Sequence, residues 1–162
     1  MKPAELARTL LAFVVLIVLH YTVRPLLGWR AAPDFLVIAL LVVSIRVRPG
    51  TAAVVGLCVG LISDALDLQA FGAGALAMCV VGFAASWLKA VFFADDIILN
   101  ALFLFAGKWA FDIIYLLTEH QYGFGELLLQ LLVWSPLSAL VTAAFGMLAL
   151  LLLRPILKPQ PA

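Results

Sequence analysis

The chain has 162 residues, of which 66% are apolar and 12% are charged. A mean hydropathy of +1.19 excludes a soluble globular domain, because a chain of this size has too little interior to hide so many apolar side chains. It also excludes disorder, which requires low hydrophobicity and high charge. The net charge of +1, without a basic stripe, argues against binding to nucleic acid. The composition therefore predicts an all-α polytopic membrane protein.

Six apolar runs follow one another along the chain, and a spanning helix needs about 20 mostly apolar residues. The first run resembles a signal peptide, but no small-residue cleavage site follows it at once, so we interpret it as an uncleaved span. The second run, opened by Pro33, is short for a span and could be re-entrant. The last run is long, and Pro136 predicts a kink in it. We expect one integral membrane domain over residues 1–162, a six-helix bundle with spans at about 6–23, 33–47, 51–68, 72–93, 97–118 and 127–153.

Basic residues predict the orientation of this bundle. Six spans place both termini on one side, and cytoplasmic loops carry an excess of Lys and Arg. The side of the termini carries Lys2, Arg8, Arg46, Arg48, Lys89, Arg154 and Lys158, whereas the other side carries only Arg24 and Arg30. We therefore expect both termini in the cytoplasm of a bacterial inner membrane. With loops of at most about nine residues, such a protein acts inside the bilayer or through short loops.

Three ionisable residues fall within the predicted spans: Asp64, Lys108 and Asp112. Charge at membrane depth is costly, so each is a candidate functional residue. Lys108 and Asp112 are four positions apart on one helix and can pair. If the third and fifth spans touch, Asp64 joins them in an intramembrane polar cluster. Such a cluster either fixes helix packing or forms a ligand site or proton relay. His20, near the outer end of the first span, is typical of an interfacial hydrogen-bonding residue.

Small residues mark the third and fourth spans. Gly56 and Gly60 form a GxxxG pattern, which lets helix backbones approach closely in lipid. Gly72 and Gly74 follow at the turn between the two spans. These glycines either pack the bundle internally or form a groove for the transmembrane helix of a partner.

Known catalytic and metal-binding patterns are missing from the sequence. Two intramembrane aspartates suggest an aspartyl peptidase, but the GxGD signature and the Asn-rich motifs of lipoprotein signal peptidases are absent. No nucleophile elbow, HExxH or P-loop occurs. Cys58 and Cys79 lie in apolar runs without a CxxC or histidine cluster, so we expect neither a metal nor a cofactor. The sequence predicts a protein that is not an enzyme.

Taken together, these motifs resemble one family. Pro33-Asp34-Phe35 opening a short span, Gly56-x-x-x-Gly60-Leu61-Ile62-Ser63-Asp64, and Phe71-Gly72-x-Gly74 followed by Gly82 are similar to the MreD family of bacterial rod shape-determining membrane proteins. The resemblance covers nearly the whole chain and extends to length, six spans and internal termini.

The resemblance implies a noncatalytic subunit of the cell-elongation machinery that supports peptidoglycan synthesis. Its direct partner would be an MreC-like single-span scaffold. Through that scaffold it would connect an MreB-like filament to a RodA-like glycosyltransferase and a penicillin-binding transpeptidase. Membrane lipid surrounds it in this role. We expect the partner interface to include Gly56, Gly60, Asp64, Gly72 and Gly74.

The MreD family is also similar in fold to the substrate-binding S-components of ECF vitamin transporters, which gives an alternative function. That alternative predicts a cavity open to the outside and lined by aromatic and polar groups. Residues that could line it are Trp109, Tyr115, Glu119, His120 and Trp134, which otherwise anchor the protein at the membrane interface.

Overall fold

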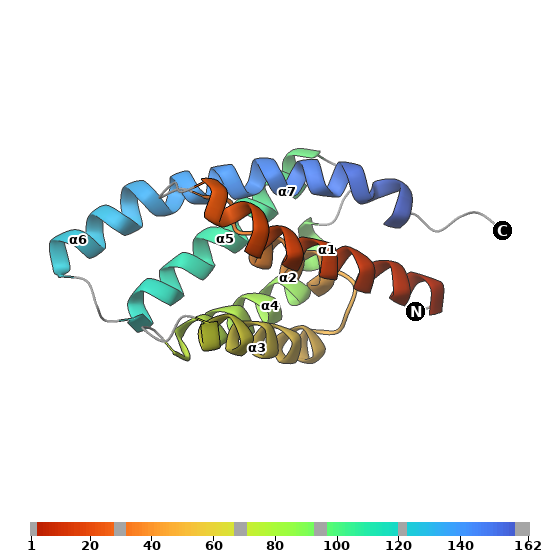
Figure 1. Cartoon of the computed structure of the whole chain (residues 1–162), viewed down its shortest axis with the longest axis horizontal. Helices are drawn as coiled ribbons and strands as arrows, with labels where there is room; N and C mark the ends of the chain where they lie inside the picture. Colours follow the sequence, from red (N-terminus) through yellow and green to blue (C-terminus); the bar gives the residue numbers. More distant parts are fainter. Residues whose placement is uncertain (1–2, 28–31, 67–70, 93–96, 120–122, 158–162) are drawn as a thin grey trace.

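The computed structural model describes residues 3–27, 32–66, 71–92, 97–119 and 123–157 (Figure 1). All regular structure in these ranges is helical, so the predicted all-α class is confirmed. The elements are α1 (Pro3–Leu27), α2 (Phe35–Ser44), α3 (Pro49–Leu66), α4 (Ala73–Phe92), α5 (Ile97–Glu119), α6 (Phe124–Leu129), η2 (Gln130–Trp134) and α7 (Ser135–Leu157). Helices α6, η2 and α7 follow one another without a break and form one continuous helical rod. Together with α1 to α5, the described residues therefore form six helical rods.

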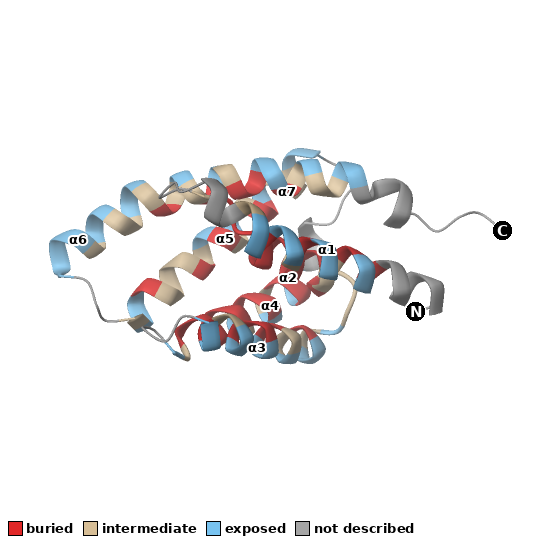
Figure 2. Cartoon of the chain, viewed as in Figure 1, coloured by how far each residue is buried: buried red, intermediate tan, exposed pale blue. Residues whose placement is uncertain are grey.

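The rods run roughly along the long axis of the molecule, and the start of α1 and the end of α7 lie at the same end (Figure 1). Within the described ranges, three helical stretches are long and apolar enough to cross a membrane, namely Pro49–Leu66, Ile97–Glu119 and Phe124–Leu152. Large apolar side chains are exposed on the outward faces of the helices (Figure 2), as expected of surfaces that contact lipid. The structure is that of a membrane-embedded six-helix bundle.

Helix α2 lies at the centre of this bundle. It contacts α1, α3, α4, α5 and α7, and every residue from Phe35 to Val42 is at most 3% exposed. With 10 residues, α2 is about 15 Å long, half the roughly 30 Å of a bilayer core. At the predicted second span, 33–47, the structure therefore has a half-length helix, and nine of its ten residues are buried.

A π-helical turn interrupts the last rod. In η2 the backbone N–H of Ser135 donates to Gln130 O, five residues back, immediately before Pro136. Proline supplies no backbone donor, so the helix is irregular at this point. The sequence predicts a kink at Pro136, and the structure has one wide, π-helical turn immediately before that residue.

Some residues used to predict orientation lie outside the described part of the chain. Lys2, Arg30 and Lys158 are in undescribed segments, and the side chains of Arg8, Arg24, Lys89 and Arg154 are not described. Among the described positions, Arg46 and Arg48 follow α2 at the end of the bundle opposite Asp34. Below, the end where α1, α3 and α5 finish is called the predicted outer end.

Candidate functional site

The glycines of α3 are packed inside the α3–α4 hairpin. A Cβ atom at Gly56 would collide with the main chain of Met78, and one at Gly60 would collide with the main chain of Ala75. Both glycines are buried. They let the two backbones approach closely, which is the use of small residues expected in lipid. These two positions are therefore covered by α4, so the helix of a partner cannot reach them in this conformation.

Asp64 closes the outer end of the same hairpin. Its Oδ2 accepts hydrogen bonds from the backbone N–H groups of Gly72 and Ala75, both at 2.9 Å. These groups belong to the first turn of α4, where backbone donors lack helical partners and a negative charge is favoured. Asp64 thus caps α4 from the neighbouring helix, and its carboxylate is only 6% exposed.

Gly72 and Gly74 make this cap possible. Gly72 has a φ of +98°, a backbone conformation that side-chain-bearing residues rarely adopt. A Cβ atom at Gly74 would collide with Oδ1 of Asp64. The motif from Gly56 to Gly74 therefore forms one structural unit. Its close helix packing, its tight turn and its carboxylate cap depend on one another.

A second polar centre lies on the other side of α2. The ammonium of Lys108 donates to Asp112 Oδ1 at 2.6 Å and to Asp34 Oδ2 at 3.1 Å. Ser135 donates to the other oxygen of Asp112 at 2.9 Å. Both Lys108 and Asp34 are 5% exposed. A buried charge requires this kind of pairing, because desolvation without a partner is very costly.

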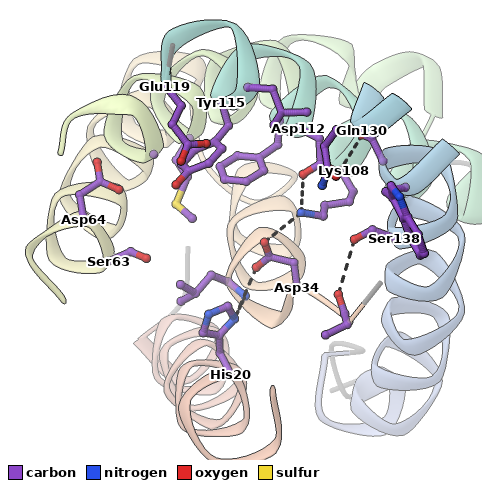
Figure 3. A pocket seen from close by; sticks show the side chains of 18 residues that line it. His20, Asp34, Ser63, Asp64, Lys108, Asp112, Tyr115, Glu119, Gln130 and Ser138 are labelled. Carbon is purple, nitrogen blue, oxygen red and sulfur yellow. Dashed lines mark hydrogen bonds and ion pairs between the residues drawn. The ribbon is translucent and has the colours of Figure 1, made fainter. Parts of the chain in front are cut away.

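Asp34 connects this centre to four helices. Its Oδ1 accepts from the backbone N–H of Val37 at 3.3 Å and so caps α2, while its own N–H donates to Thr142 on α7. His20 of α1 places Nδ1 3.4 Å from the same Oδ1. We call the residues His20, Asp34, Lys108, Asp112 and Ser135 the buried ion-pair network (Figure 3).

The buried ion-pair network lies about midway along the bundle rather than at one of its ends. Lys108 is the middle residue of α5, which runs from Ile97 to Glu119, and Asp34 is in direct contact with it. Helix α2 therefore fills only the half of the bundle near Arg46. Its N-terminus points toward the predicted outer half.

A cavity of about 270 Å³ occupies that outer half. Its floor is the buried ion-pair network and its walls come from α1, α3, α4, α5, η2 and α7 (Figure 3). The lining residues include His20, Asp34, Ser63, Asp64, Lys108, Asp112, Tyr115, Glu119, Gln130, Trp134, Ser135 and Ser138. At roughly 30 Å³ per molecule, this volume accommodates about nine waters. It also lies near the lower end of the range for small-ligand pockets.

The structure brings the predicted site residues together differently from the expectation. Asp64 lines the same cavity as Lys108 and Asp112, but the described acids bonded to Lys108 are Asp34 and Asp112. Asp64 instead accepts hydrogen bonds from backbone N–H groups at the N-terminus of α4. Of the residues named for an outward cavity, Tyr115, Glu119 and Trp134 line it, Trp109 is not among the lining residues, and His120 lies outside the described residues.

Two signals in the sequence could have located this cavity. Lys108, Asp112, Tyr115 and Glu119 recur at helical spacing and form one polar stripe on α5. The expected second span at 33–47 places Asp34 at its start, so Asp34 is not among the site residues predicted within the membrane. Because that span is short, its first residue, Asp34, can lie inside the bundle rather than at its end.

No metal centre is formed by the described residues. Among them, no group of three or more His, Cys, Asp and Glu side chains is arranged to hold an ion. Within the same ranges, Cys58 is exposed, Cys79 is half-buried and both are free thiols.

Comparison with known proteins gives a single family. The family model described as rod shape-determining protein MreD matches residues 5–157, nearly the whole chain. The comparisons with curated proteins and with solved structures found no match.

Proposed function

Because the chain belongs to the MreD family of rod shape-determining membrane proteins, we propose that it is a noncatalytic subunit of the bacterial cell-elongation complex. In this role it binds an MreC-like single-span scaffold and supports peptidoglycan synthesis in the inner membrane. Both termini lie in the cytoplasm. The observation that carries the proposal is the family match over residues 5–157.

The distribution of polar groups supports a binding role of this kind. The Asp64 carboxylate and the buried ion-pair network bond to groups within the bundle. The outward faces are apolar, with residues such as Val54 and Ile62 at least 60% exposed. A single-span partner would associate with such a face by close packing and a few polar contacts, since lipid provides no hydrophobic drive between helices.

The turn between α3 and α4 is the part of the expected interface that a partner can reach. Gly56, Gly60 and Gly74 are enclosed by the hairpin, whereas a Cβ atom added at Gly72 would have nothing within 4 Å, and Phe71 is 62% exposed. We propose that the scaffold contacts this turn at the predicted outer end. Asp64 then contributes indirectly, by holding the turn in shape.

Co-purification tests the proposed function. The tagged protein is solubilised gently from native membranes, and the accompanying proteins are identified by mass spectrometry. We expect a single-span coiled-coil protein together with peptidoglycan synthases. Recovery of paired ATPases with a coupling membrane protein would overturn the proposal in favour of the transporter alternative.

A crosslinking pair tests the proposed interface. A photoreactive residue at Phe71 is expected to crosslink to the scaffold in native membranes. The matched control is Trp87, an aromatic residue 71% exposed on the same hairpin but near the opposite end of α4. Equal crosslinking at both positions, or crosslinking at Trp87 alone, would contradict an interface at the turn.

A further inference from the structure

The cavity above the N-terminus of α2 has features that internal packing alone does not require. Packed protein interiors contain few voids larger than a water molecule. This cavity measures about 270 Å³ and lies within the membrane-embedded bundle. Its walls carry charged, hydroxyl and aromatic groups from six helical elements. A space of this size and polarity holds water or a polar ligand.

The charge of the cavity walls favours a cation. Four carboxylates line the cavity, at Asp34, Asp64, Asp112 and Glu119, whereas Lys108 is the single lysine or arginine among the lining residues. The helix N-termini of α2 and α4 offset part of the charge of Asp34 and Asp64, since each of these acids caps one of them. On the α5 side, Asp112 bonds to Lys108 and Ser135, and Glu119 follows seven residues later on the same helical face.

Aromatic rings stand beside these acids. The rings of Phe111 and Tyr115 are stacked, with centroids 5.8 Å apart, and both residues line the cavity together with Trp134. The ammonium of Lys108 already lies 4.8 Å from the centroid of the Phe111 ring. Ring faces attract cations, most strongly where water is excluded. The walls therefore combine the two groups that recognise an organic ammonium ion.

The last helical rod contributes one wall of the cavity through its π-helical turn. Helix α6 has no extensive contact with any helix other than the adjoining η2, and it projects beyond α5 in Figure 1. Tyr115 and Glu119 of α5 line the cavity together with Gln130 and Trp134 of η2. The π-helical turn of η2 supplies both of these last residues, and such turns are frequent at functional sites.

We propose that this cavity binds a ligand carrying a primary ammonium group, which is held by the carboxylates of Asp112 and Glu119 against the aromatic wall. The described His, Cys, Asp and Glu side chains do not converge as metal ligands do, so an organic ammonium fits the site better than a metal ion. The same chemistry is offered by the headgroup of an aminolipid and by a soluble amine. The proposal is independent of the scaffold interface.

Lipid competition on the wild-type protein provides the first test. The detergent-purified protein is mixed with equimolar phosphatidylethanolamine, phosphatidylcholine and phosphatidylglycerol, and bound lipid is measured by native mass spectrometry. We expect about fivefold more phosphatidylethanolamine than phosphatidylglycerol, the ratio that one cation–π contact supplies. The amount of bound phosphatidylcholine should fall between these two, because its quaternary ammonium retains the charge and donates no hydrogen bond.

Ethanolamine tests whether the ligand is a soluble amine. It is added to the protein in phosphatidylglycerol nanodiscs, and a rise in Tm would show that it binds.

A pair of variants locates the binding. Glu119→Gln removes one wall carboxylate, and Glu126→Gln makes the same change on exposed α6, outside the residues that line the cavity. We expect the lipid preference to be lost in the first variant and kept in the second. Preference for phosphatidylethanolamine without an effect of ethanolamine assigns the site to a lipid, and an ethanolamine effect assigns it to a soluble amine. The absence of both responses, or a preference unchanged in Glu119→Gln, overturns the proposal.

Discussion

Lys108 and Asp34 are 74 positions apart in the sequence, yet their charged groups lie 3.1 Å apart in the interior of the bundle. This ion pair joins α5 to the N-terminus of the central helix α2. It also fixes the level at which α2 begins.

Removing the cation of this pair is expected to destabilise the folded protein strongly. Lys108→Met leaves the carboxylates of Asp34 and Asp112 buried without their shared ammonium. We expect the free energy of unfolding to fall by about 3–5 kcal/mol, as when one partner of a buried ion pair is removed. The measurement is thermal unfolding in detergent, with Arg48→Met as the control at an exposed position.

Neutralising the two acids as well separates charge from packing. In the triple variant Lys108→Met, Asp34→Asn, Asp112→Asn, no uncompensated charge remains at these three positions, so much of the lost stability should return. If Lys108→Met alone is as stable as Arg48→Met, the ion pairs do not contribute to the stability of the bundle.

The role of Asp64 as a helix cap gives an ordered series of variants. Asp64→Ala removes the acceptor for the N–H groups of Gly72 and Ala75, and we expect a loss of about 1–2 kcal/mol. Asp64→Asn keeps a carbonyl acceptor and loses only the interaction of charge with the helix end, so its loss should be smaller. Thermal unfolding of both variants is the test. A loss in Asp64→Asn as large as in Asp64→Ala would show that charge, rather than hydrogen bonding, dominates.

Two glycines of α3 should respond in opposite ways to alanine. At Gly60 the added methyl group meets the main chain of Ala75, so the hairpin must open and we expect a loss of about 1–3 kcal/mol. At Gly50 nothing lies within 4 Å of the new atom, and the lower entropy of the unfolded chain predicts a small gain. Unfolding midpoints measure both. Equal effects of the two substitutions would contradict the close packing of α3 against α4.

Cysteine labelling tests the proposed orientation. In a background with Cys58 and Cys79 replaced by serine, Gly125→Cys is expected to react with a maleimide that cannot cross the membrane when it is added outside intact spheroplasts. Gly50→Cys, at the opposite end of the bundle, should react only after permeabilisation. The reverse pattern would place the termini outside.

Much of the architecture follows from the sequence, because long apolar runs and short polar turns leave few alternatives to a helical bundle. The close approach of α3 and α4 was also visible in the spacing of Gly56 and Gly60. The sequence could not decide between internal packing and a partner groove, since both uses require the same small residues. The main chains of Met78 and Ala75 lie against these glycines in the structure, which favours internal packing.

The candidate site was harder to predict, because depth in the membrane was inferred by assuming that each run crosses fully. Under that assumption Asp34 lies at the start of a span, and Asp64 is the acid expected to join the Lys108–Asp112 pair. Because α2 is half-length, Asp34 lies deep instead and forms the ion pair. Half of the polar stripe on α5, Lys108 and Asp112, was recognisable from the sequence as an ion pair. Tyr115 and Glu119 extend this stripe toward the predicted outer end.

The short central helix has a consequence for biogenesis. During synthesis α2 emerges second, but its ten residues reach only about halfway across a bilayer, and its Asp34 needs partners that come later. Lys108 follows 74 positions afterwards, and Thr142, which accepts a hydrogen bond from the Asp34 backbone, follows 108 positions afterwards. Helix α2 can therefore reach its final environment only after α7 has entered the membrane. Although α2 is synthesised early, its contacts are thus among the last to form. If translation is interrupted before Thr142, α2 remains dependent on the insertion machinery.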